Sequence, residues 1–195
     1  MVATVQKNTF NGKFFRIGWL CLLLVLFCSA LGAAAGAEKY ELGIQLTGMH
    51  LHKIDEVPFG IGVRFHYNLL PLLASDVELS HYPQNSSGNF GETTALFGVR
   101  FGTHLDRLGV FGKARSGWIH FGGGYFDLRL DRKTHAILDT GGMVEYYPSA
   151  HTFLRIDASD VVIYYGSARL FNRPNPDPLG TVHNFQPGFG FGFRF

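Results

Sequence analysis

The chain ends in the stretch "PGFGFGFRF" (187–195), in which an aromatic ring occupies every second position. Strict alternation is typical of a β-strand, because successive side chains point to opposite faces. One face of this strand is therefore aromatic, and the other carries almost no side-chain atoms. The aromatic face holds Phe189, Phe191, Phe193 and Phe195, and the residues between them are Gly188, Gly190, Gly192 and Arg194.

Seven further segments alternate in the same way, at 40–50, 59–68, 72–82, 93–103, 108–120, 135–147 and 152–165, and the terminal segment covers 183–195. Segments of about ten residues match a tilted transmembrane strand. An even number near eight matches the smallest bacterial barrels. We therefore predict an all-β fold, an eight-stranded antiparallel up-and-down transmembrane β-barrel. In 152–165 the alternation is lost near Asp160, where we expect a bulge or the edge of the membrane.

The connections between these segments alternate in length. Three are short: "LLP" (69–71), "HLDR" (104–107) and "PSAH" (148–151). The others are the longer stretches 52–58, 83–92, 121–133 and 167–181. Outer-membrane barrels have short periplasmic turns and long extracellular loops. We expect the same arrangement here, with both ends of the barrel domain facing the periplasm.

The N-terminus has the three parts of a secretory signal peptide: a basic start, the apolar run "IGWLCLLLVLFC" and the small residues "SALGAAAGA". The apolar run is shorter than the roughly 20 residues that span a bilayer. We predict a signal peptide at 1–37, cleaved after Ala37, and a barrel domain at 38–195; an uncleaved anchor helix is the alternative.

Both cysteines lie in the apolar run, and each directly follows a bulky residue. A lipoprotein signal has a small residue at that position, so we expect no lipidation. Cleavage would leave 14 basic and 15 acidic residues, so the basic pI indicates no nucleic-acid partner.

Charged residues occupy the polar faces in balanced number. We expect them to form a lumen ion-pair network, because a buried charge is tolerated only when it is paired. The alternative is a soluble lipocalin-like barrel, in which the same residues would form a solvated outer face. The cations are Arg64, Arg100, Lys113, Arg115, Arg155 and Arg194, and the anions are Glu41, Asp76, Glu78, Asp139, Glu145 and Asp157.

Aromatic residues near segment ends favour the membrane alternative. Tyr40, Trp118 and Tyr146 lie on the apolar faces, where the interfacial aromatic girdles of membrane barrels belong. We therefore expect the terminal phenylalanine rings to face lipid. The glycines between them would leave space inside for Arg194 and its neighbours.

The last strand, "HNFQPGFGFGFRF", resembles the C-terminal strand of small OmpA/OmpX-like outer-membrane barrels of Gram-negative bacteria. The stretches "ALFGVRFGTHLDRLGVFGKARSGWIHFGGG" and "GGMVEYYPSAHTFLRIDASDVVIYYG" resemble outer-membrane barrel proteins of acidobacterial type, for which no activity is assigned. The resemblance implies that Phe189, Phe191, Phe193 and Phe195 form an assembly signal read by the barrel-assembly machinery. Periplasmic chaperones would be further partners during biogenesis.

An eight-stranded barrel has an interior just wide enough for side chains. We therefore expect a monomer without cofactors, not a wide channel, that has a structural or surface-recognition role through its long loops. Its partners would be outer-membrane lipid and lipopolysaccharide, whose phosphates suit basic side chains. The loop recognition candidates are Phe126, Arg129, Arg132, Arg169 and Arg173; a plain solvated loop is the alternative.

Two other functions remain open at this stage. Some small barrels are lipid A deacylases or palmitoyltransferases, and "HYPQNSSGNFGE" (81–92) offers a histidine, two serines and Glu92. However, Pro83 stands where the deacylase pattern needs serine. A narrow pore would require a lumen that the charged residues leave open.

The sequence contains only a weak signal for a metal site. His50 and His52 share a face of one segment, but His66 and His183 have no evident company. We therefore expect no metal site.

Overall fold

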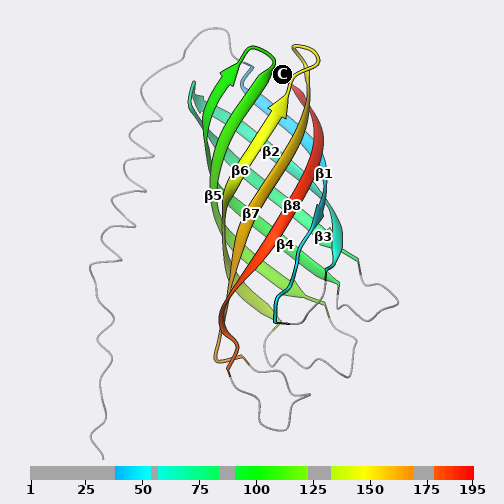
Figure 1. The fold of residues 1–195 in the computed structure, drawn as a ribbon, viewed down its shortest axis with the longest axis vertical. Coiled ribbons are helices and arrows are strands. Elements are labelled where there is room, and N and C mark those ends of the chain that lie inside the picture. The colour runs from blue at the N-terminus through cyan, green and yellow to red at the C-terminus, as the bar shows by residue number, and fades with distance from the viewer. Residues whose placement is uncertain (1–37, 54–56, 84–90, 123–132, 169–177) are drawn as a thin grey trace, which may run out of the picture. The chain divides into compact units, whose positions relative to one another are not determined.

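A computed structural model of the protein describes residues 38–53, 57–83, 91–122, 133–168 and 178–195. They form one closed antiparallel sheet in which each strand pairs with the next and the last pairs with the first (Figure 1). The predicted eight-stranded barrel is confirmed, and the predicted signal peptide lies outside the described residues. The strands are β1 (Tyr40–Gly48), β2 (Phe59–Leu70), β3 (Leu73–Tyr82), β4 (Glu92–Leu105), β5 (Leu108–Phe121), β6 (Thr134–Tyr146), β7 (Thr152–Gly166) and β8 (Gly180–Arg194).

The two ends of the barrel differ in how its strands are joined. The turns β2–β3, β4–β5 and β6–β7 lie at one end together with the C-terminus, and we call this the turn end (Figure 1). The two-residue β4–β5 turn has Asp106 at a φ of 52°, a left-handed conformation that aspartate tolerates in such hairpins. The strand ends that lead into the longer connections lie at the opposite end, which we call the loop end. No helix within the described part of the chain is long and apolar enough to cross a membrane.

Inward and outward side chains alternate along β7. In β7, side chains point inward at every second residue from Phe153 to Tyr165, and the β6–β7 ladder continues through Tyr164. No bulge occurs at Asp160; the register of the β7–β8 ladder shifts instead between Tyr164 and Gly166. The alternative expectation, the edge of the membrane, stays a prediction. The alternation disappears from the sequence after Asp160 because Val161, Val162, Ile163 and Tyr164 are all apolar or aromatic, although the backbone does not change phase.

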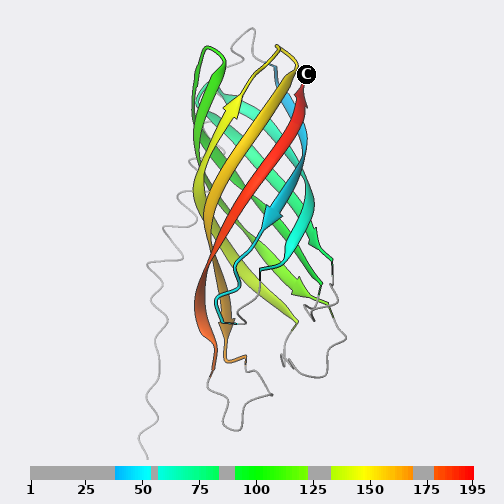
Figure 2. The same ribbon diagram turned by 45° about the vertical axis from the view of Figure 1, so that its right-hand side comes forward.

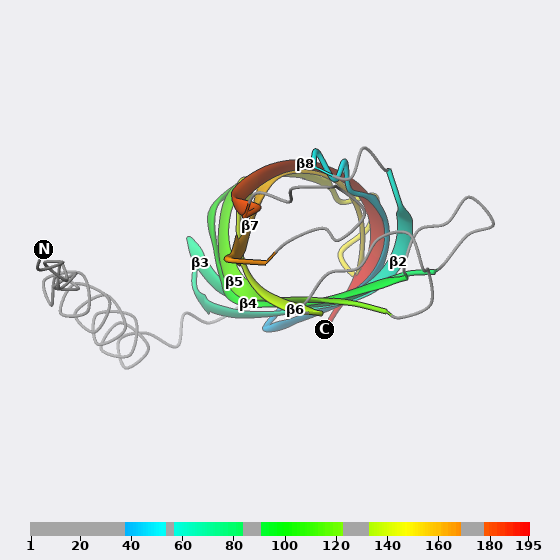
Figure 3. The same ribbon diagram turned by 90° about the horizontal axis from the view of Figure 1, so that it is seen from below.

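The barrel closes between the two ends of its sequence. β1 lies beside β8 (Figure 2), and Figure 3 shows the complete ring viewed from the loop end. At the turn end the backbones of Tyr40 and Phe195 exchange two hydrogen bonds, each 2.9 Å long. The last residue of the chain therefore completes the sheet.

Candidate functional site

Most of the charged side chains expected in the lumen are buried inside the barrel. Eleven of the twelve are at most 3% exposed, and Arg194 is 14% exposed at the turn end. Each of the twelve takes part in at least one ion pair. All eight strands contribute, so the network involves the whole circumference.

Some ion pairs follow directly from the strand register. Arg64 lies opposite Glu78 in the β2–β3 ladder, and its Nε donates to Glu78 Oε2 over 2.9 Å. Arg115 lies opposite Asp139 in the β5–β6 ladder, and its Nε donates to Asp139 Oδ2 over 2.7 Å. Opposed side chains on one face of a sheet are close neighbours. These pairs therefore join adjacent strands a second time, beyond the backbone hydrogen bonds.

Other ion pairs cross the interior between strands that are not neighbours. The guanidinium of Arg100 on β4 binds Glu41 on β1 at 2.6 Å and Glu145 on β6 at 3.0 Å. Lys113 Nζ on β5 donates to Asp157 Oδ1 on β7 over 2.7 Å. Because these contacts bridge the lumen, the charged side chains occupy its cross-section.

Arg115 and Glu78 lie at the centre of the network. Glu78 accepts hydrogen bonds from both Arg64 and Arg115, and from Ser80 Oγ at 2.8 Å. Arg115 also approaches Asp76 at 3.4 Å. Removing either residue would take one partner away from each of several buried charges.

His66 belongs to this network, although no partner for it was evident from the sequence. Its Nδ1 lies 3.1 Å from Glu41 Oε2, and its Nε2 lies 3.4 Å from Asp76 Oδ1. Glu41, His66 and Glu145 also bring three potential metal-ligand atoms within 4.8 Å of one another. Arg100 binds both of these carboxylates, so a guanidinium already supplies the positive charge there. One feature of the sequence could have placed His66 in the network: it shares the polar face of its segment with Arg64.

The turn-end mouth is closed by an aromatic and cationic layer. The Tyr147 hydroxyl donates to Glu145 Oε2 and lies 3.0 Å from His104 Nε2. The Arg194 guanidinium stacks 4.4 Å from the centre of the Tyr147 ring and pairs with Glu38 at 3.2 Å. Burial raises the pKa of the Tyr147 phenol, and the Glu145 carboxylate raises it further. Tyr147 therefore stays protonated and remains a donor.

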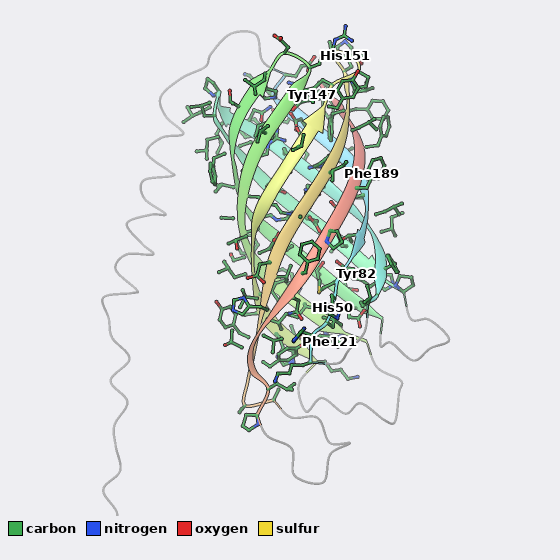
Figure 4. The ribbon with its side chains drawn as sticks, viewed as in Figure 1. His50, Tyr82, Phe121, Tyr147, His151 and Phe189 are labelled. Atoms are coloured by element: carbon green, nitrogen blue, oxygen red, sulfur yellow. The ribbon has the colours of Figure 1, made fainter. Side chains whose placement is uncertain are left out.

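The loop-end half of the interior is mainly apolar, although Glu92 and His135 are also buried there. Its apolar inward side chains form one buried cluster, which the sequence analysis did not expect. Tyr82 and Phe121 of this cluster are labelled near the loop end in Figure 4, where Tyr147 marks the turn end. The cluster consists of Met49, Leu51, Tyr82, Leu96, Ile119, Phe121, Ile137, Val161, Ile163, Tyr165, Ala168 and Val182, with Leu179 packed against it.

The glycines of β8 make room for the neighbouring strand. A Cβ at Gly188 would approach the Asp157 carboxylate to 2.9 Å, and one at Gly192 would collide with the Phe153 ring. The space opposite the phenylalanines is thus taken up by side chains of β7. Arg194, which was expected to use it, lies instead at the turn-end mouth.

The outer surface of the barrel is apolar. Phe189, Phe193 and Phe195 are between 50% and 61% exposed, and Phe189 lies on the outside of β8 in Figure 4. At the turn end, the Tyr40 ring lies 5.3 Å from Tyr67 and 5.8 Å from Phe195, between ring centres. Such exposed aromatic groups near a strand end match an interfacial girdle.

Solved structures with a similar fold exist. The N-terminal β-barrel domain of Pseudomonas aeruginosa OprF superposes with a TM-score of 0.53 at 16% identity, covering 82% of this chain and 99% of that one. Neisserial surface protein A superposes with a TM-score of 0.54 at 14% identity, covering 80% of this chain and 96% of that one. The chain has the fold of a small outer-membrane β-barrel. No family model matches the sequence, and no match is found among curated proteins.

The barrel separates two residues of the deacylase-like motif. His81 lies on the outer face of β3, 3.0 Å from Thr93 Oγ1, whereas Glu92 at the start of β4 is buried and faces inward. The sheet lies between them, so Glu92 is not the acid that orients His81. Ser86 and Ser87 lie outside the described residues.

The recognition candidates Phe126, Arg129, Arg132, Arg169 and Arg173 also lie outside the described residues. Four other polar residues do gather on the described outer surface at the loop end. His50, His52, Asp160 and His183 line one pocket there. Sequence reasoning missed this group because its members come from the segment after β1, from β7 and from β8.

Proposed function

We propose that the protein is an integral β-barrel of the bacterial outer membrane that acts through its long loops and does not form a wide channel. The observation that carries this proposal is the inverted distribution of polarity. Charged side chains are buried within the barrel, while residues such as Leu46, Phe59 and Ile156 are 62–75% exposed on its outside. Exposing so much apolar surface to water would be energetically unfavourable, whereas contact with lipid hydrocarbon is favourable.

The orientation follows from the connections. The short turns and the C-terminus share one end, which corresponds to the periplasmic side of bacterial barrels. The longer connections would then face the cell exterior. Loops on a rigid scaffold commonly carry recognition, and the arginines at 129, 132, 169 and 173 suit phosphate groups such as those of lipopolysaccharide.

Cell fractionation tests the location. We expect the full chain in the outer membrane, as a band whose mobility on SDS gels changes on boiling. Deletion of Phe195 should reduce this band, since it removes the backbone hydrogen bonds to Tyr40 and the terminal ring. Phe195→Tyr keeps both and serves as the control. A soluble protein with no mobility shift would overturn the proposed membrane insertion.

Binding to lipopolysaccharide tests the role of the loops. Substitution of Arg129 and Arg132 by glutamine should weaken binding of the purified barrel to lipopolysaccharide micelles. The barrel itself should keep its heat-modifiable mobility. Lys39→Gln, near the turn end, is the matched control because it removes charge away from the proposed surface. Equal binding by all three proteins would refute recognition through this loop.

A further inference from the structure

The segment after β1 continues beside β8 in the wall of the barrel. His50 forms a β-bridge with Phe185, and the His52 N–H donates to Asn184 Oδ1 over 3.0 Å. Continuing this antiparallel register by two residues places His52 opposite His183. Two sequence-distant parts of the chain thereby bring three histidines to one surface.

These histidines line a common pocket. Its volume is about 360 Å³, and its lining includes His50, His52, His183 and Asp160, together with Asn184 and Phe185. The His183 side chain is 70% exposed and the Asp160 side chain is 46% exposed. The pocket therefore opens to the outer surface of the barrel at its loop end.

The His50 and His52 rings have a spacing that suits shared coordination. Their centroids lie 5.6 Å apart. Two imidazoles that bind one Zn²⁺ at tetrahedral angles, with Zn–N distances of about 2.0–2.1 Å, have ring centroids about 5.2 Å apart. Side-chain rotations have to bring the three donor atoms together around an ion, because among the described residues only Glu41, His66 and Glu145 already place three potential ligand atoms within 4.8 Å of one another.

Asp160 orients the third imidazole. Its Oδ2 lies 2.7 Å from His183 Nδ1. Because a carboxylate only accepts hydrogen bonds, Nδ1 carries the hydrogen and donates to it, and the neutral ring keeps its lone pair on Nε2. Metal-binding histidines usually have such a carboxylate behind them, because it fixes the tautomer and raises the basicity of the ligand.

We propose that His50, His52 and His183 bind one divalent transition-metal ion, with Zn²⁺ as the reference ion, and that Asp160 positions His183. Imidazole donors suit Zn²⁺, Cu²⁺ and Ni²⁺, whereas Mg²⁺ and Ca²⁺ prefer oxygen. Three protein ligands leave one position of a tetrahedral ion open to water or to an external group. The site ties the segment after β1 to β8 at the loop end.

Metal titration of the full chain tests the proposal. The protein is expressed without a polyhistidine tag, purified from membranes in detergent, and titrated with ZnCl₂ by calorimetry. One ion per chain is expected. CoCl₂ should give the visible absorption of tetrahedral Co²⁺. His183→Ala and His52→Ala should each weaken binding at least tenfold, and Asp160→Asn about 10–100-fold.

Two other outward histidines near the loop end provide matched controls. His81 and His120 are exposed, and each hydrogen-bonds to a threonine, Thr93 or Thr134. His81→Ala and His120→Ala should leave both Zn²⁺ affinity and the Co²⁺ spectrum unchanged. Heat-modifiable mobility shows that every variant is folded. The proposal is overturned if the parent chain binds no ion at 100-fold molar excess, if His183→Ala binds as the parent does, or if the control variants lose affinity equally.

Discussion

The turn-end half of the interior is packed with ion pairs, whereas the loop-end half is packed mainly with apolar side chains, among which Glu92 and His135 are also buried. Both halves are equally well buried: Arg115 is 1% exposed and Ile163 is 0% exposed. The charged half holds its strands through directional contacts, such as the 2.6 Å bridge from Arg100 to Glu41. The apolar side chains of the other half need no matched partners, because burial of apolar surface away from water is not directional.

Substitutions destabilise the two halves of the interior for different reasons. A truncated apolar side chain leaves a cavity, and the cost depends on how well its surroundings collapse. A missing charge leaves its partners desolvated and unpaired, which is more damaging than the pair is stabilising. Substitutions in the two halves therefore separate these effects within a single barrel.

The largest effect is expected from placing an unpaired charge in the apolar half. Ile163→Asp puts a carboxylate where the surrounding residues form the apolar cluster, at a cost of several kcal/mol for one desolvated ion. We expect the heat-modifiable band to be lost on SDS gels. Ile163→Val should retain it, and a folded Ile163→Asp barrel would contradict the assignment of a dry interior at this end.

Removing the central cation of the charged half should have the next largest effect. Arg115→Met leaves Glu78 and Asp139 short of a partner and should lower the free energy of unfolding by about 3–5 kcal/mol. Urea titration of the barrel in lipid vesicles measures it. Arg194→Met, at the partly exposed mouth, should lower it by a smaller amount; equal losses would show that burial of the network is unimportant.

A cavity in the apolar half should cost somewhat less. Ile119→Ala removes a fully buried side chain, and we expect a loss of about 3 kcal/mol in the same urea titration. Ile61→Ala is the matched control, because Ile61 is 56% exposed on the outer surface. If the two substitutions cost the same, the inward cluster contributes no more than the lipid-facing surface.

The smallest effect is expected at the turn-end mouth. Tyr147→Phe removes the hydrogen bond to the Glu145 carboxylate but keeps the ring under Arg194. A hydrogen bond to a charged group contributes about 2 kcal/mol, so unfolding should become easier by that amount. Because the Tyr147 pKa is raised, the difference between the two proteins should persist into mildly alkaline buffer. A difference that vanishes by pH 10 would contradict this.

The sequence was sufficient for the fold and for part of the interior. Where inward residues are charged and outward residues are apolar, as around Arg64 and Arg155, the period of two is visible and the strands are confirmed. The apolar cluster could not be predicted, because in "DVVIYYG" (160–166) both faces of the strand are apolar and the alternation disappears. The grouping of His183 with His50 and His52 was also hidden, since it depends on the closure of β1 against β8.

That closure also constrains how the chain can fold. Pairing between β1 and β8 joins the most distant parts of the domain, so it has the largest loop-closure entropy and a high contact order. Until β8 pairs with it, one edge of β1 has no partner, and exposed edges invite pairing with other chains. Closure of the ring therefore also protects the barrel, because it removes the last free strand edge at which another chain could add.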